Sequence, residues 1–93
     1  NYRTKRAEID LIAKYKNNLI FVEVRTKVGD RFGSPEDTLT HGKKRKLLWN
    51  ARAYVAKKKY KGLYRIDAIC TVLCGDGTAI PQRISHHENI VEN

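Results

Sequence analysis

The chain has 93 residues, enough for one domain with one modest core. Its two cysteines are too few for a disulfide framework, so we expect Cys70 and Cys74 to be reduced core residues. No apolar run approaches the roughly 20 residues that span a bilayer and no signal-peptide pattern is present, so we expect a cytoplasmic protein with no membrane partner. The net charge is +9, and residues 38–66 hold ten basic residues and no acidic one, which favours a polyanionic partner.

The first predicted elements form a β-hairpin. Residues 7–15 alternate apolar and polar side chains, which is typical of a strand, and residues 19–25 are an apolar run interrupted by Glu23, which indicates a central strand covered on both faces. Residues 16–18 (Lys-Asn-Asn) are short and turn-like, so we expect the two strands to pair. Residues 28–37 contain two glycines and a proline and predict a loop.

A helix and two further strands complete the predicted fold. Thr40 is the expected N-cap of a helix that runs to about Tyr60, and Gly62 marks its end. Residues 65–73 form a β-rich run, and a last short strand lies near residues 83–90 after a Gly-Asp-Gly turn. The order β-β-α-β-β predicts a single α/β domain over the whole chain, in which the basic helix packs on a mixed β-sheet.

Two acidic side chains of the hairpin, Asp10 and Glu23, are the candidate site, and their relative position depends on the strand register. If residues 16–17 are the central pair of the turn, Asp10 lies opposite Glu23 with Cβ atoms about 5 Å apart. Two carboxylates this close repel one another unless a cation lies between them, and Mg²⁺ prefers such oxygen ligands. If residues 17–18 form the turn, Asp10 instead faces Arg25 in a simple cross-strand ion pair. Spacing leaves both registers open.

Three blocks of sequence match a known family. They are Glu8 to Ala13 (Glu-Ile-Asp-Leu-Ile-Ala), Phe21 to Lys27 (Phe-Val-Glu-Val-Arg-Thr-Lys) and Arg31 to Glu36 (Arg-Phe-Gly-Ser-Pro-Glu). Together they resemble the YraN-like family of uncharacterised bacterial proteins, which looks like a branch of the PD-(D/E)XK nuclease superfamily near the archaeal Holliday junction resolvases. The resemblance covers nearly the entire chain and implies a restriction-endonuclease-like fold. Because the chain has no methionine and begins at Asn1, we expect the N-terminal helix of that fold to be missing.

The resemblance also implies roles for residues of the hairpin. Asp10 matches the metal-binding aspartate, Glu23 the acidic residue of the E-x-K motif and Arg25 the catalytic lysine, and the carbonyl of Val24 would be a further metal ligand. Bound Mg²⁺ or Mn²⁺ would polarise the scissile phosphate and help to deprotonate an attacking water. A cation at the position of Arg25 would stabilise the negative charge that develops on the phosphate. The implied catalytic residues are Asp10, Glu23, Arg25 and Lys27, and the implied metal ligands are Asp10, Glu23, Val24 and Glu8.

Two departures from the family pattern bear on catalysis. Arg25 is always protonated, so it can stabilise negative charge but can scarcely act as a base, as a lysine of lowered pKa can. Lys27, on the same face of the strand, would compensate. Related resolvases also carry an acidic residue on a helix before the first strand, so either Glu8 replaces that acid or the ligand lies in the missing segment. The missing helix would also leave an apolar sheet face open to self-association.

The basic helix is the predicted nucleic-acid surface, and we expect DNA as its partner, with RNA as the alternative. The residues expected to bind are Lys43, Lys44, Arg45, Lys46 and Arg52. Four aromatic residues accompany the helix and could stack on exposed bases, although helical spacing favours a core position for Tyr54; they are Trp49, Tyr54, Tyr60 and Tyr64. A solvated helix face with no partner explains the same charge pattern.

Three further polar residues have alternative interpretations. His86 and His87 are adjacent, so on a strand they point to opposite faces and cannot jointly bind a metal; we expect them at the surface or on an edge. Asp67 either approaches the candidate site from the neighbouring strand or forms an ion pair with a lysine of the helix.

Two functions are consistent with these observations. The first is a metal-dependent endonuclease that hydrolyses phosphodiester bonds in DNA, including branched DNA. The alternative is a catalytically inactive DNA- or RNA-binding module on a nuclease fold. A protein-interaction domain that meets an acidic partner is less favoured. Because junction resolvases commonly act as symmetric dimers, the resemblance also implies a homodimer.

Overall fold

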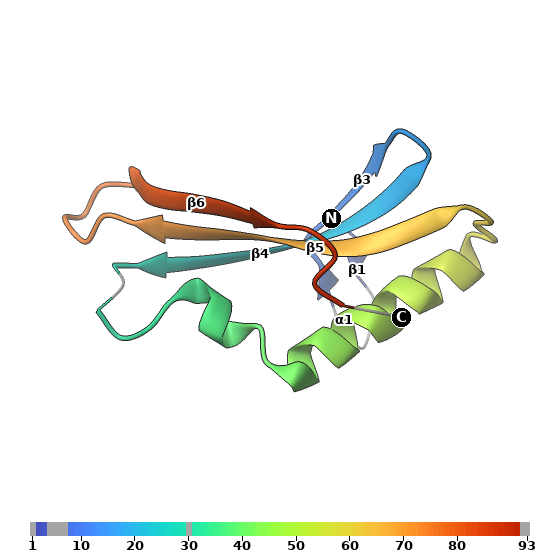
Figure 1. Ribbon diagram of the computed structural model, residues 1–93, viewed down its shortest axis with the longest axis horizontal. Helices are drawn as coiled ribbons and strands as arrows, with labels where there is room; N and C mark the ends of the chain where they lie inside the picture. Colours follow the sequence, from blue (N-terminus) through green and yellow to red (C-terminus); the bar gives the residue numbers. More distant parts are fainter. Residues whose placement is uncertain (1, 4–7, 30, 92–93) are drawn as a thin grey trace.

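The structure, a computed structural model, describes residues 2–3, 8–29 and 31–91, with side chains from Asp10 onward. At its centre is a four-stranded mixed sheet in the order β3-β4-β5-β6 (Figure 1). The strands are β3 (Leu11–Tyr15), β4 (Asn18–Val28), β5 (Leu63–Leu73) and β6 (Pro81–His87). Two short strands, β1 (Tyr2–Arg3) and β2 (Glu8–Ile9), form a separate antiparallel pair.

The topology confirms the predicted order β-β-α-β-β and the α/β class. Strand β4 pairs antiparallel with β3 and parallel with β5, and β6 pairs antiparallel with β5 at the other edge. The parallel pair requires a crossover, which the 3-10 helix η1 (Pro35–Thr38) and the helix α1 (His41–Lys57) provide. Both helices lie on the same side of the sheet (Figure 1). This arrangement fits a restriction-endonuclease-like fold.

The register of the β3–β4 hairpin is the one in which residues 16–17 are the centre of the turn. Tyr15 pairs with Asn18 and Leu11 pairs with Val22, and Lys16 adopts a φ of 54°. The alternative register, which would pair Asp10 with Arg25, is therefore excluded. The single strand predicted over residues 7–15 is wrong in one respect, because the chain bends at Asp10 and separates β2 from β3.

The core lies between α1 and the sheet. Leu47 and Ala51 of α1 pack against Phe21 of β4 and Ile66 of β5. The Phe21 ring also meets two aromatic rings edge-on, those of Tyr54 at 5.5 Å and Tyr64 at 5.9 Å between centroids. Tyr54 therefore belongs to the core region, as its helical spacing predicted, and the apolar face of α1 determines which side of the helix meets the sheet.

The two ends of α1 are capped differently. Thr40 is the N-cap, as predicted, and its hydroxyl oxygen accepts a hydrogen bond from the Lys43 N–H at 3.2 Å. The helix ends at Lys57 rather than near Tyr60. Lys59 takes a left-handed φ of 53°, and its N–H donates to Ala56 while that of Tyr60 donates to Val55. This is a Schellman cap with lysine where glycine is usual, so Gly62 does not end the helix.

Other boundaries shift by a few residues. Strand β5 starts at Leu63, two residues before the predicted run, and β6 covers Pro81–His87 rather than residues 83–90. The predicted loop over residues 28–37 contains the first residues of η1, which proline can start because it lacks an N–H that would need a partner. Both cysteines are free, as expected; Cys70 is buried, whereas Cys74 follows β5 and is half-buried.

The sheet face opposite α1 carries exposed apolar side chains. Leu11, Val24 and Ile84 lie on this face by their register and are each more than two-fifths exposed. Self-association through this face stays a prediction. No helix among the described residues combines the length and the apolar character that crossing a bilayer requires.

Candidate functional site

The two predicted acidic residues come together where β3 begins. Glu23 lies on β4, on the face that α1 covers, and its side chain is only 5% exposed. Asp10 lies at the bend before β3, and its Oδ2 accepts a hydrogen bond from the Val24 N–H at 2.9 Å. The negative charge of Asp10 helps to raise the pKa of Glu23. The hairpin register thus places both carboxylates beside the same short stretch of β4.

The bend at Asp10 explains this convergence. Pairing between β3 and β4 stops at Leu11 and Val22, so the next N–H of β4 on that side, from Val24, bonds to the Asp10 side chain instead of to a strand. The N–H and C=O groups of one residue in an antiparallel strand point toward the same neighbour. The Val24 carbonyl is therefore directed toward the side of β4 where Asp10 lies, which is consistent with the third ligand that the family resemblance implies.

Two cations balance the Glu23 carboxylate. Its Oε2 lies 3.0 Å from Nη2 of Arg25 and 3.2 Å from Nζ of Lys43. Burial nevertheless raises the pKa of Glu23, because the loss of hydration outweighs the opposing effects of Lys43 and Arg25, and the charge of Asp10 acts in the same direction as burial. Nε of Arg25 is buried without a hydrogen-bond partner in the described part of the chain. The site therefore holds two carboxylates and two cations, partly shielded from water.

Lys43 is part of this site, although the sequence did not predict it there. It was expected to bind nucleic acid, whereas its ammonium reaches the acidic residue on β4 from the first turn of α1. The Thr40 cap determines where α1 starts and so where Lys43 lies along it. The contact itself depends on how α1 packs on the sheet, for which the local sequence contains no signal.

The remaining predicted site residues have different surroundings. Nζ of Lys27 donates to the Phe32 carbonyl at 3.2 Å, so in this structure it ties down the loop after β4. The side chain of Glu8 falls outside the described residues. The other predicted nucleic-acid-binding residues follow Lys43 along α1, where Lys44 is half-buried and the rest are exposed; they are Arg45, Lys46 and Arg52. Contributions of these residues to binding or catalysis stay predictions.

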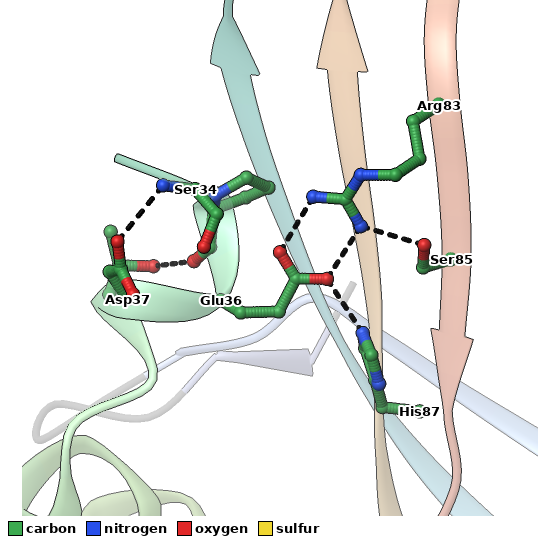
Figure 2. Close-up of polar contacts among 8 residues, drawn as sticks. Ser34, Glu36, Asp37, Arg83, Ser85 and His87 are labelled. Atoms are coloured by element: carbon green, nitrogen blue, oxygen red, sulfur yellow. Dashed lines mark hydrogen bonds and ion pairs between the residues drawn. The ribbon is translucent and has the colours of Figure 1, made fainter. Parts of the chain in front are cut away.

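A second polar cluster connects η1 to the edge strand β6 (Figure 2), where His87 lies level with Glu23 in the strand register. Glu36 of η1 accepts two hydrogen bonds from the Arg83 guanidinium, at 2.7 and 2.8 Å, and its Oε2 lies 2.7 Å from Nε2 of His87. The Arg83 hydrogen bond is the main reason why the pKa of Glu36 lies well below its usual range. Ligand atoms of Glu36, Cys70 and His87 lie within 4.8 Å of one another.

This cluster is better explained as a structural clamp than as a metal centre. A guanidinium that donates to both oxygens of Glu36 places a positive charge where a metal ion would have to bind. The Cys70 side chain is buried, and burial raises the pKa of its thiol, which disfavours the thiolate that a metal requires. The clamp links η1 to β6 and so helps to determine where α1 begins.

Asp67 belongs to neither position expected for it. It pairs with Val22 across β4 and β5, so it faces away from Glu23 and α1. Its carboxylate is buried and binds Arg65 at 3.0 Å, His86 at 2.8 Å and the Asn89 N–H at 2.9 Å. These partners lower the pKa of Asp67 despite the opposing effect of its burial. Asp67 thus helps to fasten the segment after β6, and its contact with His86 confirms that the two adjacent histidines point to opposite faces.

Comparisons with known proteins support the family resemblance. A model of a family described as "Uncharacterised protein family UPF0102" matches residues 1–71. A UPF0102 protein of Clostridium botulinum (strain Loch Maree / Type A3) is 41% identical over 75 residues, which cover 78% of this chain and 61% of that protein. One of Phocaeicola vulgatus is 36% identical over 88 residues, covering 95% of this chain and 69% of that protein. The chain therefore spans about 61% of the length of several of its relatives. These matches confirm the YraN-like resemblance: the chain belongs to the uncharacterised protein family UPF0102.

Proposed function

We propose that this protein is a metal-dependent nuclease that hydrolyses phosphodiester bonds in nucleic acid, with DNA as the preferred substrate. The observation that carries the proposal is the convergence of Asp10 and Glu23 on the stretch of β4 around Val24, next to the first turn of a strongly basic helix. A carboxylate pair beside a cationic surface is suited to bring a phosphate and a hard cation together.

The residues of the site fit a hard divalent cation. Asp10, Glu23 and the Val24 carbonyl would supply oxygen ligands, which Mg²⁺ and Mn²⁺ prefer. Burial of Glu23 together with the charge of Asp10 raises the pKa of Glu23, and a bound cation would relieve that electrostatic penalty. When bound, the metal would supply Lewis acidity and a water of lowered pKa.

The cationic residues would handle the negative charge of the substrate. Arg25 keeps its guanidinium beside Glu23, where it can stabilise charge that develops on a phosphate. Lys43 contacts the same carboxylate from α1 and is 30% exposed, so its ammonium can transfer from Glu23 to an arriving phosphate oxygen. The basic residues further along α1 would then hold neighbouring phosphates of the same strand.

A second candidate is a binding module that does not cleave. It is favoured by one observation, that the cations needed to neutralise Glu23 are already supplied by Arg25 and Lys43. In such a protein the two ion pairs are structural, and the basic face of α1 binds nucleic acid without a metal.

The test compares cleavage with binding in the same full-length protein. Nicking of supercoiled plasmid and of labelled branched DNA is measured with Mg²⁺ and with Mn²⁺ for the wild type, Glu23→Gln and Asp10→Asn. The matched control is Glu88→Gln, which neutralises a carboxylate that is 63% exposed and contacts Arg65 instead. Mn²⁺ binding is measured in parallel by calorimetry.

If the protein is a nuclease, the wild type and Glu88→Gln cleave DNA, whereas Glu23→Gln and Asp10→Asn lose both cleavage and Mn²⁺ binding. A binding module shows no cleavage with either metal in any variant, while its salt-sensitive affinity for DNA survives all three substitutions. Cleavage that persists in Glu23→Gln and Asp10→Asn would place the reaction elsewhere and refute the proposed site.

A further inference from the structure

The only tryptophan of the chain, Trp49, lies on the outward side of α1 and is 65% exposed. The core-facing side of the same helix buries Leu47 and Ala51. Trp49 is also a member of the surface hollow described below. Single exposed apolar side chains are common on protein surfaces, so the position of Trp49 becomes informative only through the residues around it.

Cations surround this indole at helical spacing. Arg45 precedes Trp49 by four residues, Lys46 precedes it by three and Arg52 follows it by three, so all three project from neighbouring positions of the helix surface. Together with Leu48 they line a hollow of about 290 Å³. This volume is at the lower limit of small-molecule pockets, which suits a flat group the size of a nucleobase better than a larger ligand.

The combination of a flat aromatic surface with cations identifies the chemistry of the ligand. Phosphates would neutralise Arg45, Lys46 and Arg52, and the face of a base would fit on the indole. Residues 38–66 contain ten basic residues and no acidic one, so charge complementarity also favours a polyanion. Bases inside a duplex are already stacked on one another, which means that only an unpaired base can reach Trp49.

The hollow lies within reach of the candidate nuclease site. Trp49 is six residues beyond Lys43, so it lies about 9 Å further along the helix axis at the usual rise of 1.5 Å per residue. This distance corresponds to roughly three nucleotides of a stacked strand. Six residues also turn the position by about 120° around the helix axis, so a strand that meets Lys43 and Glu23 at one phosphate would pass partly around α1 to reach the indole.

We propose that Trp49, with Arg45 and Arg52, forms a stacking platform for an unpaired base, and that the protein prefers single-stranded segments or the single-stranded arms of branched nucleic acid. The platform is a binding site in its own right. Only the statement that these segments are the substrate rests on the nuclease proposed above.

Fluorescence tests the platform directly, because Trp49 is the only tryptophan of these 93 residues and comparison with Trp49→Phe identifies its emission. The protein is titrated, in EDTA so that no cleavage occurs, with a ten-nucleotide oligothymidylate, the matching RNA, a duplex of the same length and an abasic strand that has phosphates but no bases. Stacking predicts strong quenching by the single strands and little quenching by the duplex or the abasic strand. Comparison of oligothymidylate with oligouridylate distinguishes DNA from RNA.

Variants separate stacking from charge, with affinity measured by anisotropy of labelled strands. Trp49→Ala should weaken binding of oligothymidylate by about tenfold or more but leave the abasic strand unaffected, and Trp49→Phe should restore most of the affinity. Arg52→Gln should weaken both strands to a similar extent. The matched control is Tyr15→Ala, which removes another exposed aromatic side chain, 57% exposed, from β3.

Three results would overturn the platform. One is an equal loss of affinity for the oligothymidylate and for the abasic strand in Trp49→Ala, which would leave charge as the only contribution to binding. Another is tight binding of oligothymidylate with no quenching. The third is equal quenching by polyglutamate, which would indicate an acidic protein partner. Because all these measurements are made without metal, strong quenching without any cleavage in Mg²⁺ supports the platform while refuting the nuclease.

Discussion

Replacing Glu36 with glutamine should destabilise the protein by removing the charge that holds η1 against the sheet. The wild-type carboxylate accepts two hydrogen bonds from Arg83 at 2.7 and 2.8 Å and contacts His87 at 2.7 Å. Hydrogen bonds to a charged group contribute about 1.5–3 kcal/mol each, whereas exposed ion pairs contribute about 0–1 kcal/mol. Glu36 and Arg83 are 28% and 39% exposed, and glutamine keeps one acceptor oxygen. We therefore expect a loss of about 1–2 kcal/mol in the free energy of unfolding.

The assay is urea denaturation of the wild type and Glu36→Gln at several pH values, with Glu88→Gln as the exposed control. The pKa of Glu36 is lowered from its ordinary value of 4.5, so its charge stabilises the fold fully above that value. The stabilisation is lost as the pH falls toward the lowered pKa of the folded state. The difference between wild type and Glu36→Gln should therefore be largest near neutral pH and shrink below about pH 4.5. A difference below 0.5 kcal/mol at neutral pH, or one that grows in acid, would refute the clamp.

Three further predictions concern other parts of the molecule. Because the pKa of Glu23 is raised, protons should compete with Mn²⁺ at a higher pH than for an ordinary carboxylate, so calorimetry over a pH series should show the Mn²⁺ affinity starting to fall at a correspondingly higher pH. Lys59→Gly should raise the free energy of unfolding by about 0.5–1 kcal/mol, since glycine adopts the left-handed conformation without strain. The control Lys58→Gly should give no such gain, because Lys58 has a right-handed φ of −86°. Mass spectrometry after brief alkylation should find Cys74 modified before Cys70, whose buried thiol has a raised pKa and should react only on unfolding.

The order of the strands and the start of the helix could be predicted because local signals determine them. The apolar run ending near Arg25 and the Thr40 cap each indicate an element without knowledge of its neighbours. The end of α1 was missed for the opposite reason, since Lys59 adopts a conformation that its side chain does not favour. Glycine is the usual signal for such a cap, and the nearest glycine, Gly62, lies three residues too far along the chain.

The candidate site could be predicted only in part. Hairpin spacing limited Asp10 to two possible partners, and the resemblance assigned roles to Asp10 and Glu23. Neither the hairpin spacing nor the resemblance predicted the bend that turns the Asp10 carboxylate toward the Val24 N–H, because the alternation of apolar and polar residues continues through it. Nor could the clamp be foreseen, since Glu36 meets Arg83 across 47 residues of chain. Contacts of this kind depend on how elements pack, and sequence periodicity does not record that.

Lys43 is the residue that best separates the two candidate functions. Its ammonium lies 3.2 Å from the Glu23 oxygen that a metal would need, so the lysine and a metal compete for one ligand. If the protein is a nuclease, Lys43→Gln should bind Mn²⁺ about fivefold to tenfold more tightly, because a partly exposed competing charge has been removed. Cleavage should nevertheless slow, because the lysine no longer holds the phosphate.

The control for this experiment is Lys44→Gln, which removes the same charge from the next position of α1 and should leave Mn²⁺ affinity nearly unchanged. A pure binding module behaves differently, because neither variant acquires measurable Mn²⁺ affinity and both lose only a little affinity for DNA. Weaker Mn²⁺ binding in Lys43→Gln would contradict both accounts of the site, since it would mean that the lysine supports the metal rather than competing with it. Opposite changes in metal affinity and cleavage rate are therefore the signature that would identify Lys43 as a phosphate-binding residue in a working nuclease.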